Sequence, residues 1–377
     1  MRYDICIIGG AGHVGLPLGV SFANKGLRVI LLDINLEWLK IIRSGRFPFK
    51  EQNGDKELRK ALKNNLFTSD NPKSISLSKF IILVVGTPID KYLNPDFGGL
   101  SKIVHTYRPY FNKKQILILR STVYPGTTER IQAELEIPVA FCPERIVQGN
   151  ALKEISDLPQ IVSAFNKKTE KEVIRLFKKI TKVVITTPIE AEFSKLFSNA
   201  WRYISFAVAN QFFMIAKNSG LDYSKIYGTM MRDYPRNKDI PTPGFAAGPC
   251  LLKDTMQLAA IDNTFFLGHS AMLINEGLPG YILRTMDLKN KTIGILGMAF
   301  KANSDDGRDS LSYKLRKLAQ IKAKKVICHD VYIKGLDSLD KVLECDIVIL
   351  ATPHKEYKKI NPQKYHGKFI DIWGFWK

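Results

Sequence analysis

The chain has 377 residues, of which 45% are hydrophobic and 24% are charged, an ordinary composition for a globular protein with two or three domains. No apolar run reaches the roughly 18 residues that cross a bilayer, and the start lacks a secretory layout, so we expect no membrane insertion. The net charge of +20 is spread over separated lysine pairs such as Lys113-Lys114, which disfavours nucleic acid as a partner. Five scattered cysteines form no disulfide pattern, which favours a cytoplasmic protein, and we expect no metal site.

The first segment has the pattern of strand, glycine turn, helix and strand. A continuous apolar run at 4–8 is followed by helical periodicity over 16–23, and a second strand over 27–32 ends in Asp33. Further strands are predicted at 80–85, 115–119 and 138–141. This alternation predicts a doubly wound, mainly parallel sheet.

The glycine turn Gly10-Ala11-Gly12-His13-Val14-Gly15 fits the dinucleotide-binding pattern G-x-G-x-x-G. Gly10 would permit the tight turn, Gly12 would let the backbone approach a pyrophosphate, and Gly15 would let helix and strand pack closely. Asp33 follows Gly15 by 18 residues and can accept hydrogen bonds from a ribose diol, whereas its charge repels a 2′-phosphate. The motif therefore predicts NAD as the cofactor; the alternative is a turn that binds no ligand.

A long helix is predicted from about Glu190 to Gly220, apolar nearly all round and free of proline. It would be a buried spine between domains or subunits. A turn-rich stretch ending at Cys250 follows, and then more helix to about Leu278.

The α/β pattern resumes at Lys291 and repeats the start of the chain. A strand enters a glycine turn at Gly297, another ends in Asp330, and the run near residue 350 resembles the run near 84. The sequence predicts two Rossmann-like domains (1–187 and 288–377) that flank a helical central domain (188–287). The turn 297–301 would bind a diphosphate, with Lys301 as the cation, or nothing.

Two residue pairs have helical spacing that suits catalysis. Lys195 and Asn199 lie four residues apart in the long helix, and Cys250 and Asp254 lie four apart where a loop turns into a helix. A thiol at a helix N-terminus favours the thiolate, which is the nucleophile. The alternatives are a small buried hydrophobic cysteine and a lysine in a salt bridge, for example with Glu192.

The whole chain resembles the UDP-glucose/GDP-mannose dehydrogenase family, which includes UDP-N-acetylmannosamine dehydrogenases. Besides the glycine turn and the pairs above, the matching residues are Leu32-Asp33-Ile34-Asn35, Gly86-Thr87-Pro88, Ser121 to Thr127, Cys142-Pro143-Glu144-Arg145, Gly149-Asn150-Ala151, Glu190-Ala191-Glu192, Lys253, Ala299-Phe300-Lys301, Asp305-Asp306 and Arg308. The resemblance implies an NAD-dependent homodimer that oxidises the primary alcohol of a nucleotide-sugar to the acid, for surface polysaccharide synthesis.

The resemblance also implies a role for each site residue. Cys250 would form a thiohemiacetal and then a thioester, while Lys195 and Asn199 would stabilise oxyanions. Asp254 and Thr122 would hold the reacting water, and Glu144 would assist thioester hydrolysis. Cofactor contacts would come from Gly10, Gly12, His13, Val14, Gly15, Asp33, Thr87 and Thr122, and further substrate contacts from Glu144, Arg145, Lys195, Asn199, Arg236 (across the dimer interface), Phe300 and Lys301.

Departures from the family pattern leave the sugar and the base open. Gln148 and Gly149-Asn150-Ala151 are closer to N-acetylhexosamine members, whereas Cys-x-x-Lys-Asp is closer to the UDP-glucose type. One competing hypothesis is a single-step β-hydroxyacid-type dehydrogenase, which needs neither Cys250 nor the segment after Lys291. Another is a binding protein that has lost activity.

Overall fold

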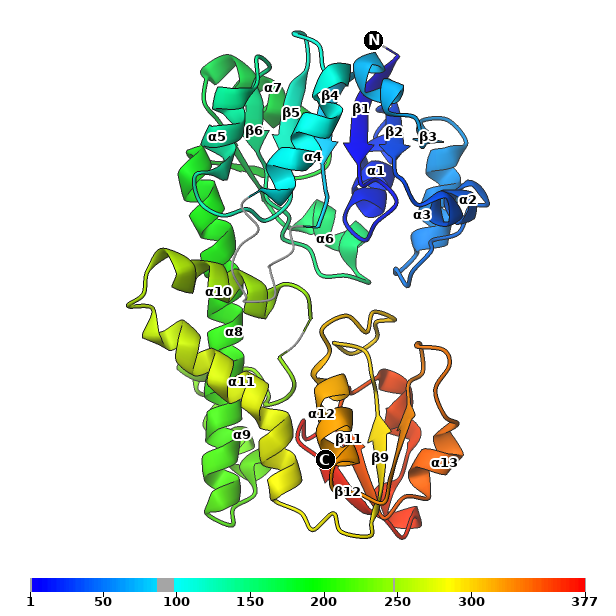
Figure 1. The fold of residues 1–377 in the computed structure, drawn as a ribbon, viewed down its shortest axis with the longest axis vertical. Helices are drawn as coiled ribbons and strands as arrows, with labels where there is room; N and C mark the ends of the chain where they lie inside the picture. The colour runs from blue at the N-terminus through cyan, green and yellow to red at the C-terminus, as the bar shows by residue number, and fades with distance from the viewer. Residues whose placement is uncertain (1, 87–97, 247, 377) are drawn as a thin grey trace. The chain divides into compact units, whose positions relative to one another are not determined.

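The computed structural model describes residues 2–86, 98–246 and 248–376. The chain forms two compact units, Met1–Phe197 and Ser198–Lys377 (Figure 1). An eight-stranded sheet lies in the first unit and a four-stranded parallel sheet in the second, and the long helix α8 (Pro188–Asn218) crosses the boundary. The predicted fold class is confirmed. The three-domain division of the sequence stays a prediction.

The sheet of the first unit has the order β3-β2-β1-β4-β5-β6-β7-β8, and its neighbours are parallel except for β6 and β7. The five strands predicted in this part of the chain are present, each within two residues of the predicted bounds; β3, β7 and β8 were not predicted. The strands are β1 (Tyr3–Ile8), β2 (Val29–Leu32), β3 (Leu66–Ser69), β4 (Ser78–Leu83), β5 (Ile116–Leu119), β6 (Val139–Phe141), β7 (Gln160–Ala164) and β8 (Val183–Ile185).

Both faces of this sheet are buried, which explains the continuous apolar runs of its strands. In β5, Ile116 and Ile118 join one hydrophobic cluster, and Leu117 and Leu119 join the cluster of the opposite face. The helices that supply the cover are α1 (Gly15–Asn24), α2 (Leu36–Arg43), α3 (Gly54–Leu62), α4 (Gly99–Tyr107), α5 (Thr127–Glu134), α6 (Ala151–Asp157) and α7 (Lys167–Phe177). The loops at the carboxyl ends of β1, β2 and β4 to β6 therefore share one edge of a rigid sheet.

The helical segment follows the sequence prediction in outline and departs from it in two respects. Helix α8 lies within two residues of the predicted bounds, but it is not buried all round, because Trp201 is 67% exposed. The helical stretch predicted after Cys250 consists of two helices and ends at Arg284 instead of about Leu278. Asp262 accepts hydrogen bonds from the backbone and hydroxyl of Thr264 and makes the turn between them. The helices of this part are α9 (Tyr223–Met231), α10 (Leu251–Ile261) and α11 (Phe266–Arg284).

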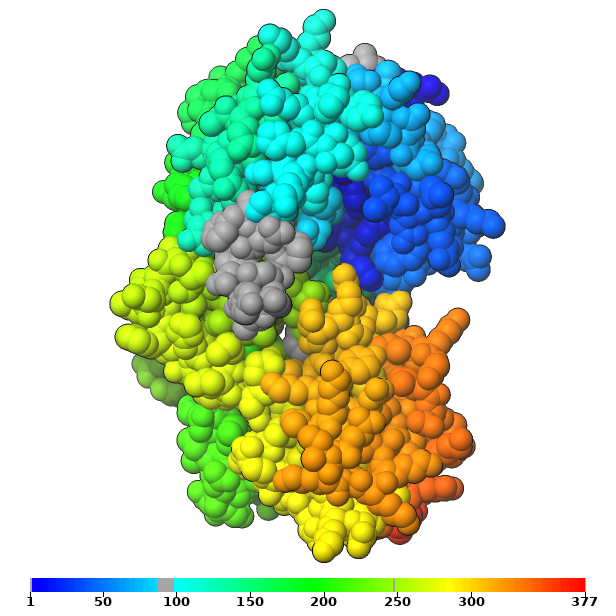
Figure 2. Space-filling view, in the orientation of Figure 1, coloured from blue at the N-terminus to red at the C-terminus, as the bar shows by residue number. Residues whose placement is uncertain are grey.

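The second sheet has the order β10-β9-β11-β12 and repeats the first in its turn geometry. Asp330 accepts hydrogen bonds from the backbone N–H groups of Met298 and Ala299, much as Asp33 accepts one from Ala11. Within this unit α11 lies against α12, and the two form one continuous surface (Figure 2). The elements are β9 (Thr292–Leu296), α12 (Leu311–Gln320), β10 (Lys325–His329), α13 (Leu339–Leu343), β11 (Ile347–Leu350) and β12 (Lys368–Asp371).

Short 3-10 helices occupy Pro72–Leu77, Arg108–Tyr110, Pro235–Asn237, Lys355–Lys359 and Pro362–Lys364. Among the described residues, no helix combines the length and the apolar character that crossing a bilayer requires.

Candidate active site

The glycine turn between β1 and α1 has the close packing that the motif predicts, but its left-handed residue is Gly9. Gly9 has φ +78°, and a Cβ there would lie 2.6 Å from the carbonyl oxygen of Val84. Gly10 is required for packing instead, since its Cβ would lie 2.8 Å from the Cα of Leu31. A Cβ on Gly15 would lie 2.4 Å from the oxygen of Gly9, so the first residue of α1 packs directly on the turn.

Asp33 directly follows β2 and lies beside this turn, as the sequence predicts. Its Oδ2 accepts a hydrogen bond from the N–H of Ala11 (2.9 Å), and its Oδ1 accepts one from the N–H of Asn35 (3.0 Å). The half-buried carboxylate is thereby fixed at the carboxyl end of the strand, and each oxygen retains acceptor capacity. This arrangement fits the ribose hydroxyls of NAD and disfavours a phosphate in the same place.

His13 and Val14 lie at the start of α1. The ring of His13 packs on Phe49, with 3.9 Å between ring centroids, and meets Trp38 edge-on at 5.9 Å. Val14 is the N-cap residue of α1. Together with Gly12, where an added Cβ would meet only ordinary contacts, they form a helix N-terminus suited to an anionic pyrophosphate.

Thr122, Glu144 and Arg145 follow the carboxyl ends of β5 and β6. Ser121 donates a hydrogen bond to the carbonyl oxygen of Val85 (2.6 Å), which fixes the backbone beside half-buried Thr122. The predicted cofactor residue Thr87 lies outside the described residues.

Glu144 is held in an ion pair that was not predicted. The nearly buried Arg120 donates to Oε2 of Glu144 from Nε (2.7 Å) and Nη2 (2.5 Å). Oε1 of Glu144 accepts from the backbone N–H groups of Arg145 (2.5 Å) and Ile146 (2.7 Å). The ion pair could have been predicted from the arginine directly after a buried strand, because a buried guanidinium requires an anionic partner.

Lys195 and Asn199 lie one turn apart in α8, and Glu192 lies on the turn before them. Glu192 accepts hydrogen bonds from the N–H of Gly126 (2.6 Å) and from the N–H (2.8 Å) and hydroxyl (2.5 Å) of Thr128. Burial raises the pKa of Glu192, although these hydrogen bonds oppose the rise. Glu192 thus anchors the start of α8 to the start of α5.

Cys250 is the N-cap residue of α10 and is exposed, which contradicts the alternative of a small buried hydrophobic cysteine. One turn along α10, Asp254 is fully buried. Its Oδ2 accepts from Nδ2 of Asn199 (2.5 Å), and its Oδ1 forms an ion pair with Nζ of Lys253 (2.5 Å). The structure thus joins Asn199 to Asp254 directly and adds Lys253, which was not predicted as a site residue.

The remaining predicted substrate residues lie in the second unit. Phe300 and Lys301 are half-buried and follow β9 through the second glycine turn. Arg236 is exposed, with its guanidinium 5.7 Å from the ring centroid of Tyr234.

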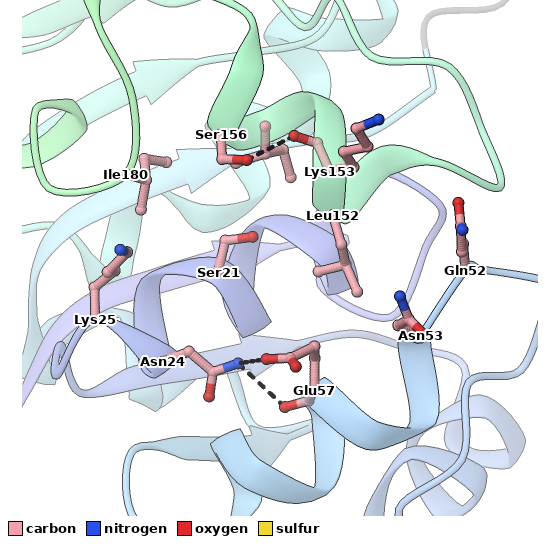
Figure 3. Close-up of a pocket in the computed structure, with 11 residues that line it drawn as sticks. Ser21, Asn24, Lys25, Gln52, Asn53, Glu57, Leu152, Lys153, Ser156 and Ile180 are labelled. Atoms are coloured by element: carbon pink, nitrogen blue, oxygen red, sulfur yellow. Dashed lines mark hydrogen bonds between the residues drawn. The ribbon is translucent and has the colours of Figure 1, made fainter.

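A cavity of about 320 Å³ lies in the first unit between α1, α3 and α6 (Figure 3). On its wall, Nδ2 of Asn24 donates to the backbone oxygen of Glu57 (3.2 Å) and to its Oε2 (3.0 Å). Its lining contains none of the predicted site residues. Within the first unit, the cavity is therefore separate from the glycine turn.

The first unit has a glycine turn with a fixed acid on a doubly wound sheet, which is the arrangement of a dinucleotide-binding protein that uses NAD. The chain belongs to the UDP-glucose/GDP-mannose dehydrogenase family: residues 3–181 match its NAD binding domain, 189–276 its central domain and 294–377 its UDP binding domain. It is thus an NAD-dependent nucleotide-sugar dehydrogenase.

Individual relatives agree with this assignment. The UDP-N-acetyl-D-mannosamine dehydrogenase of Pyrococcus horikoshii is 31% identical, over 93% of this chain and 90% of the relative. A solved structure of the UDP-D-ManNAc dehydrogenase from Pyrococcus horikoshii has a TM-score of 0.88 at 29% identity and covers 96% of this chain and 92% of its own. The NDP-N-acetyl-D-galactosaminuronic acid dehydrogenase of Ralstonia nicotianae is 25% identical, over 97% of this chain and 95% of the relative.

Proposed function

We propose that the protein oxidises the primary alcohol of a UDP-hexose or UDP-N-acetylhexosamine to the uronic acid in two steps, with Cys250 as a covalent nucleophile. The observation that carries the proposal is an exposed thiol at the start of α10, one turn from a buried carboxylate that Asn199 and Lys253 hold. An N-acetylhexosamine is the first choice of sugar, because relatives of 31% and 25% identity are named for N-acetylmannosamine and N-acetylgalactosaminuronic acid.

The chemistry uses two oxidations and one hydrolysis. NAD, when bound, accepts the hydride that leaves in each oxidation. Loss of hydride and a proton converts the alcohol to an aldehyde. The Cys250 thiolate then adds to the aldehyde carbon, and a proton adds to the resulting oxyanion to form a thiohemiacetal. The thiohemiacetal loses a hydride and its hydroxyl proton in the second oxidation, which gives a thioester. Water then attacks the thioester carbon and breaks the C–S bond, and the products are the carboxylate, the Cys250 thiolate and two protons.

The neighbouring residues stabilise charge and position water. Lys195 and Asn199 supply an ammonium and an amide from one face of α8 to developing oxyanions. Asp254, with Thr122, holds the water that accepts the alcohol proton and later attacks the thioester. Glu144 assists that hydrolysis through its charge and position. Its carboxylate accepts hydrogen bonds from the side chain of Arg120 and from the backbone N–H groups of Arg145 and Ile146.

Substrate recognition falls to Arg145, Arg236, Phe300 and Lys301, in addition to Glu144, Lys195 and Asn199. A cation and an aromatic ring after the second glycine turn suit a diphosphate and a base or sugar face. This role is supported by the match of residues 294–377 to a UDP binding domain.

The protein acts as a homodimer in this proposal, with α8 at the interface and Arg236 reaching the partner's substrate. Support comes from exposed apolar residues of α8 that form a stripe. Successive members of the stripe are four, seven, four and three residues apart, which places them on one face of the helix. Its exposed members are Phe197, Trp201, Val208, Phe212 and Ile215. A contiguous apolar face of this kind is typical of a protein interface.

The setting that fits this reaction is the cytoplasm, where NAD is available and thiols stay reduced. The uronic acid would serve as a precursor for surface polysaccharide. The three-part division at 187 and 287 also belongs to the proposal, with one part each for cofactor, catalysis and nucleotide-sugar.

The deciding experiment compares the wild type with Cys250→Ala on a panel of UDP- and GDP-sugars. We expect two NADH and one acid per substrate for the wild type, and no acid with unchanged NAD affinity for Cys250→Ala. Unchanged acid formation by the variant would exclude the covalent mechanism. A yield of one NADH without acid in the wild type would favour the single-step β-hydroxyacid-type alternative.

A further inference from the structure

The loop that carries Cys250 rests on the loop that follows β9. Gly248, two residues before the cysteine, donates its N–H to the carbonyl oxygen of Asp309 (3.1 Å). Gly248 has φ +100°, and a Cβ there would lie 2.5 Å from the ring of Phe300. Only glycine satisfies both the backbone conformation and this contact. The position of the nucleophile therefore depends on residues 300–309.

Arg308 immediately precedes the carbonyl group that Gly248 contacts, and Asp306 holds its guanidinium. Nε of Arg308 lies 3.0 Å from Oδ1 and 3.1 Å from Oδ2 of Asp306, and Nη2 lies 2.7 Å from Oδ2. The Asp306 carboxylate is itself buried and accepts the backbone N–H of Arg308 (3.0 Å). A planar guanidinium bound along one edge has a defined orientation.

The other edge of this guanidinium is available. In the described part of the chain, Nη1 of Arg308 donates no hydrogen bond to protein, and the side chain is 59% exposed. The hydrogen bonds to Asp306 raise the pKa of Arg308, and partial burial opposes this rise. The negative charges of Asp306, of a Cys250 thiolate and of Asp309 raise the pKa further. Because Coulomb interactions are mutual, the guanidinium favours the thiolate by the same interaction.

Other charged groups lie on the two segments that meet at the cysteine. Helix α10 contributes Lys253 and Asp254, which neutralise each other in their ion pair. The loop contributes Lys301 and Asp305 in addition to Asp306, Arg308 and Asp309. Among these described groups, Arg308 carries a positive charge that is coupled to the charge of Cys250.

We propose that Arg308 is a positioning residue for the nucleophile: held by Asp306 beside the Cys250 loop, its guanidinium stabilises the thiolate form of Cys250. This inference rests on the proposed function, since it assumes that the thiolate is the working form. It gives a role to Asp306 and Arg308, two residues that take no part in the reaction steps described above.

The test measures the rate at which iodoacetamide alkylates the folded protein as a function of pH. The method reports on Cys250, because the other four thiols are buried, and Cys250→Ala supplies the blank. For Arg308→Gln we expect the midpoint of the pH profile to rise and the rate at neutral pH to fall roughly three- to tenfold, given solvent screening of an exposed charge. Arg308→Lys should restore most of the rate, and Arg284→Gln, on an exposed arginine at the end of α11, should match the wild type.

An Arg308→Gln profile equal to that of the wild type would overturn the inference. If this variant does not fold, 0.5 M salt with the wild type provides the second measurement, because screening should raise the midpoint, and an unmoved midpoint would overturn the inference equally. Neither result depends on turnover. Acid formation by the Cys250→Ala variant tests the proposed function separately.

Discussion

Replacing Asp33 with alanine should weaken NAD binding and reduce the discrimination against NADP. The carboxylate lies at the end of β2, where the N–H groups of Ala11 and Asn35 fix it with its remaining acceptor capacity available to a ribose. Loss of a hydrogen bond to a charged group costs about 1.5–3 kcal/mol, which corresponds to a roughly ten- to hundredfold rise in Kd for NAD. Removal of the negative charge should at the same time lower the Kd for NADP.

The assay is a titration of the purified protein with each dinucleotide, together with the ratio of kcat/KM values for NAD and NADP. Asp33→Asn is the matched control, because it retains one acceptor oxygen for the backbone while removing the charge. We expect Asp33→Asn to lose discrimination with a smaller loss of NAD affinity than Asp33→Ala. An NAD to NADP ratio that stays at the wild-type value in both variants would refute the ribose role of Asp33.

Three further predictions concern stability and assembly. Asp254→Asn should reduce the free energy of unfolding by about 3–5 kcal/mol in denaturant titrations, because it leaves the lysine of a largely buried ion pair uncompensated; an unchanged midpoint would contradict this. Burial tends to raise the pKa of Asp330, but hydrogen bonds and the charge of His354 hold it at about 2, below the ordinary 3.8. That ionised carboxylate therefore contributes about 2 kcal/mol to the free energy of unfolding above pH 4, and this contribution is lost as pH falls towards 2. Asp330→Asn should remove this fall from a plot of the free energy of unfolding against pH. Trp201→Glu should convert a dimer to monomers in sedimentation experiments. Ile321, which follows α12, is also exposed but lies outside the α8 stripe, so Ile321→Glu should leave assembly unchanged.

The sequence predicted those strands and helices whose pattern of apolar residues directly reflects their burial. Strands buried on both faces, such as β1 and β5, have apolar runs that no other local structure explains as simply. Strand β8 has three residues, two of them exposed, so local pattern could not distinguish it from a loop. The antiparallel pairing of β6 with β7 depends on the path of the connecting chain, which periodicity does not encode.

The candidate site was predicted residue by residue where a motif fixes the chemistry, and incompletely where partners come from distant segments. Asp33 and Cys250 lie as their motifs predict. The pairing of Arg120 with Glu144 joins the ends of two neighbouring strands, so it follows only from the order of the sheet. The motif also does not distinguish Gly9 from Gly10 as the left-handed residue, because that depends on the close approach of Val84.

Four of the five thiols are enclosed by hydrophobic packing, and burial raises the pKa of Cys6 and Cys142 to about 12, so these two are nearly inert towards oxidants. Peroxide in an ageing preparation would therefore attack the accessible cysteine first and convert it to sulfenic and then to sulfinic acid. Under the covalent mechanism that we propose for Cys250, such a sample would keep its circular dichroism spectrum and its melting temperature while losing turnover. Conventional checks of sample quality would thus pass an inactive enzyme, and a titration of the remaining reactive thiol is the appropriate measure of active protein.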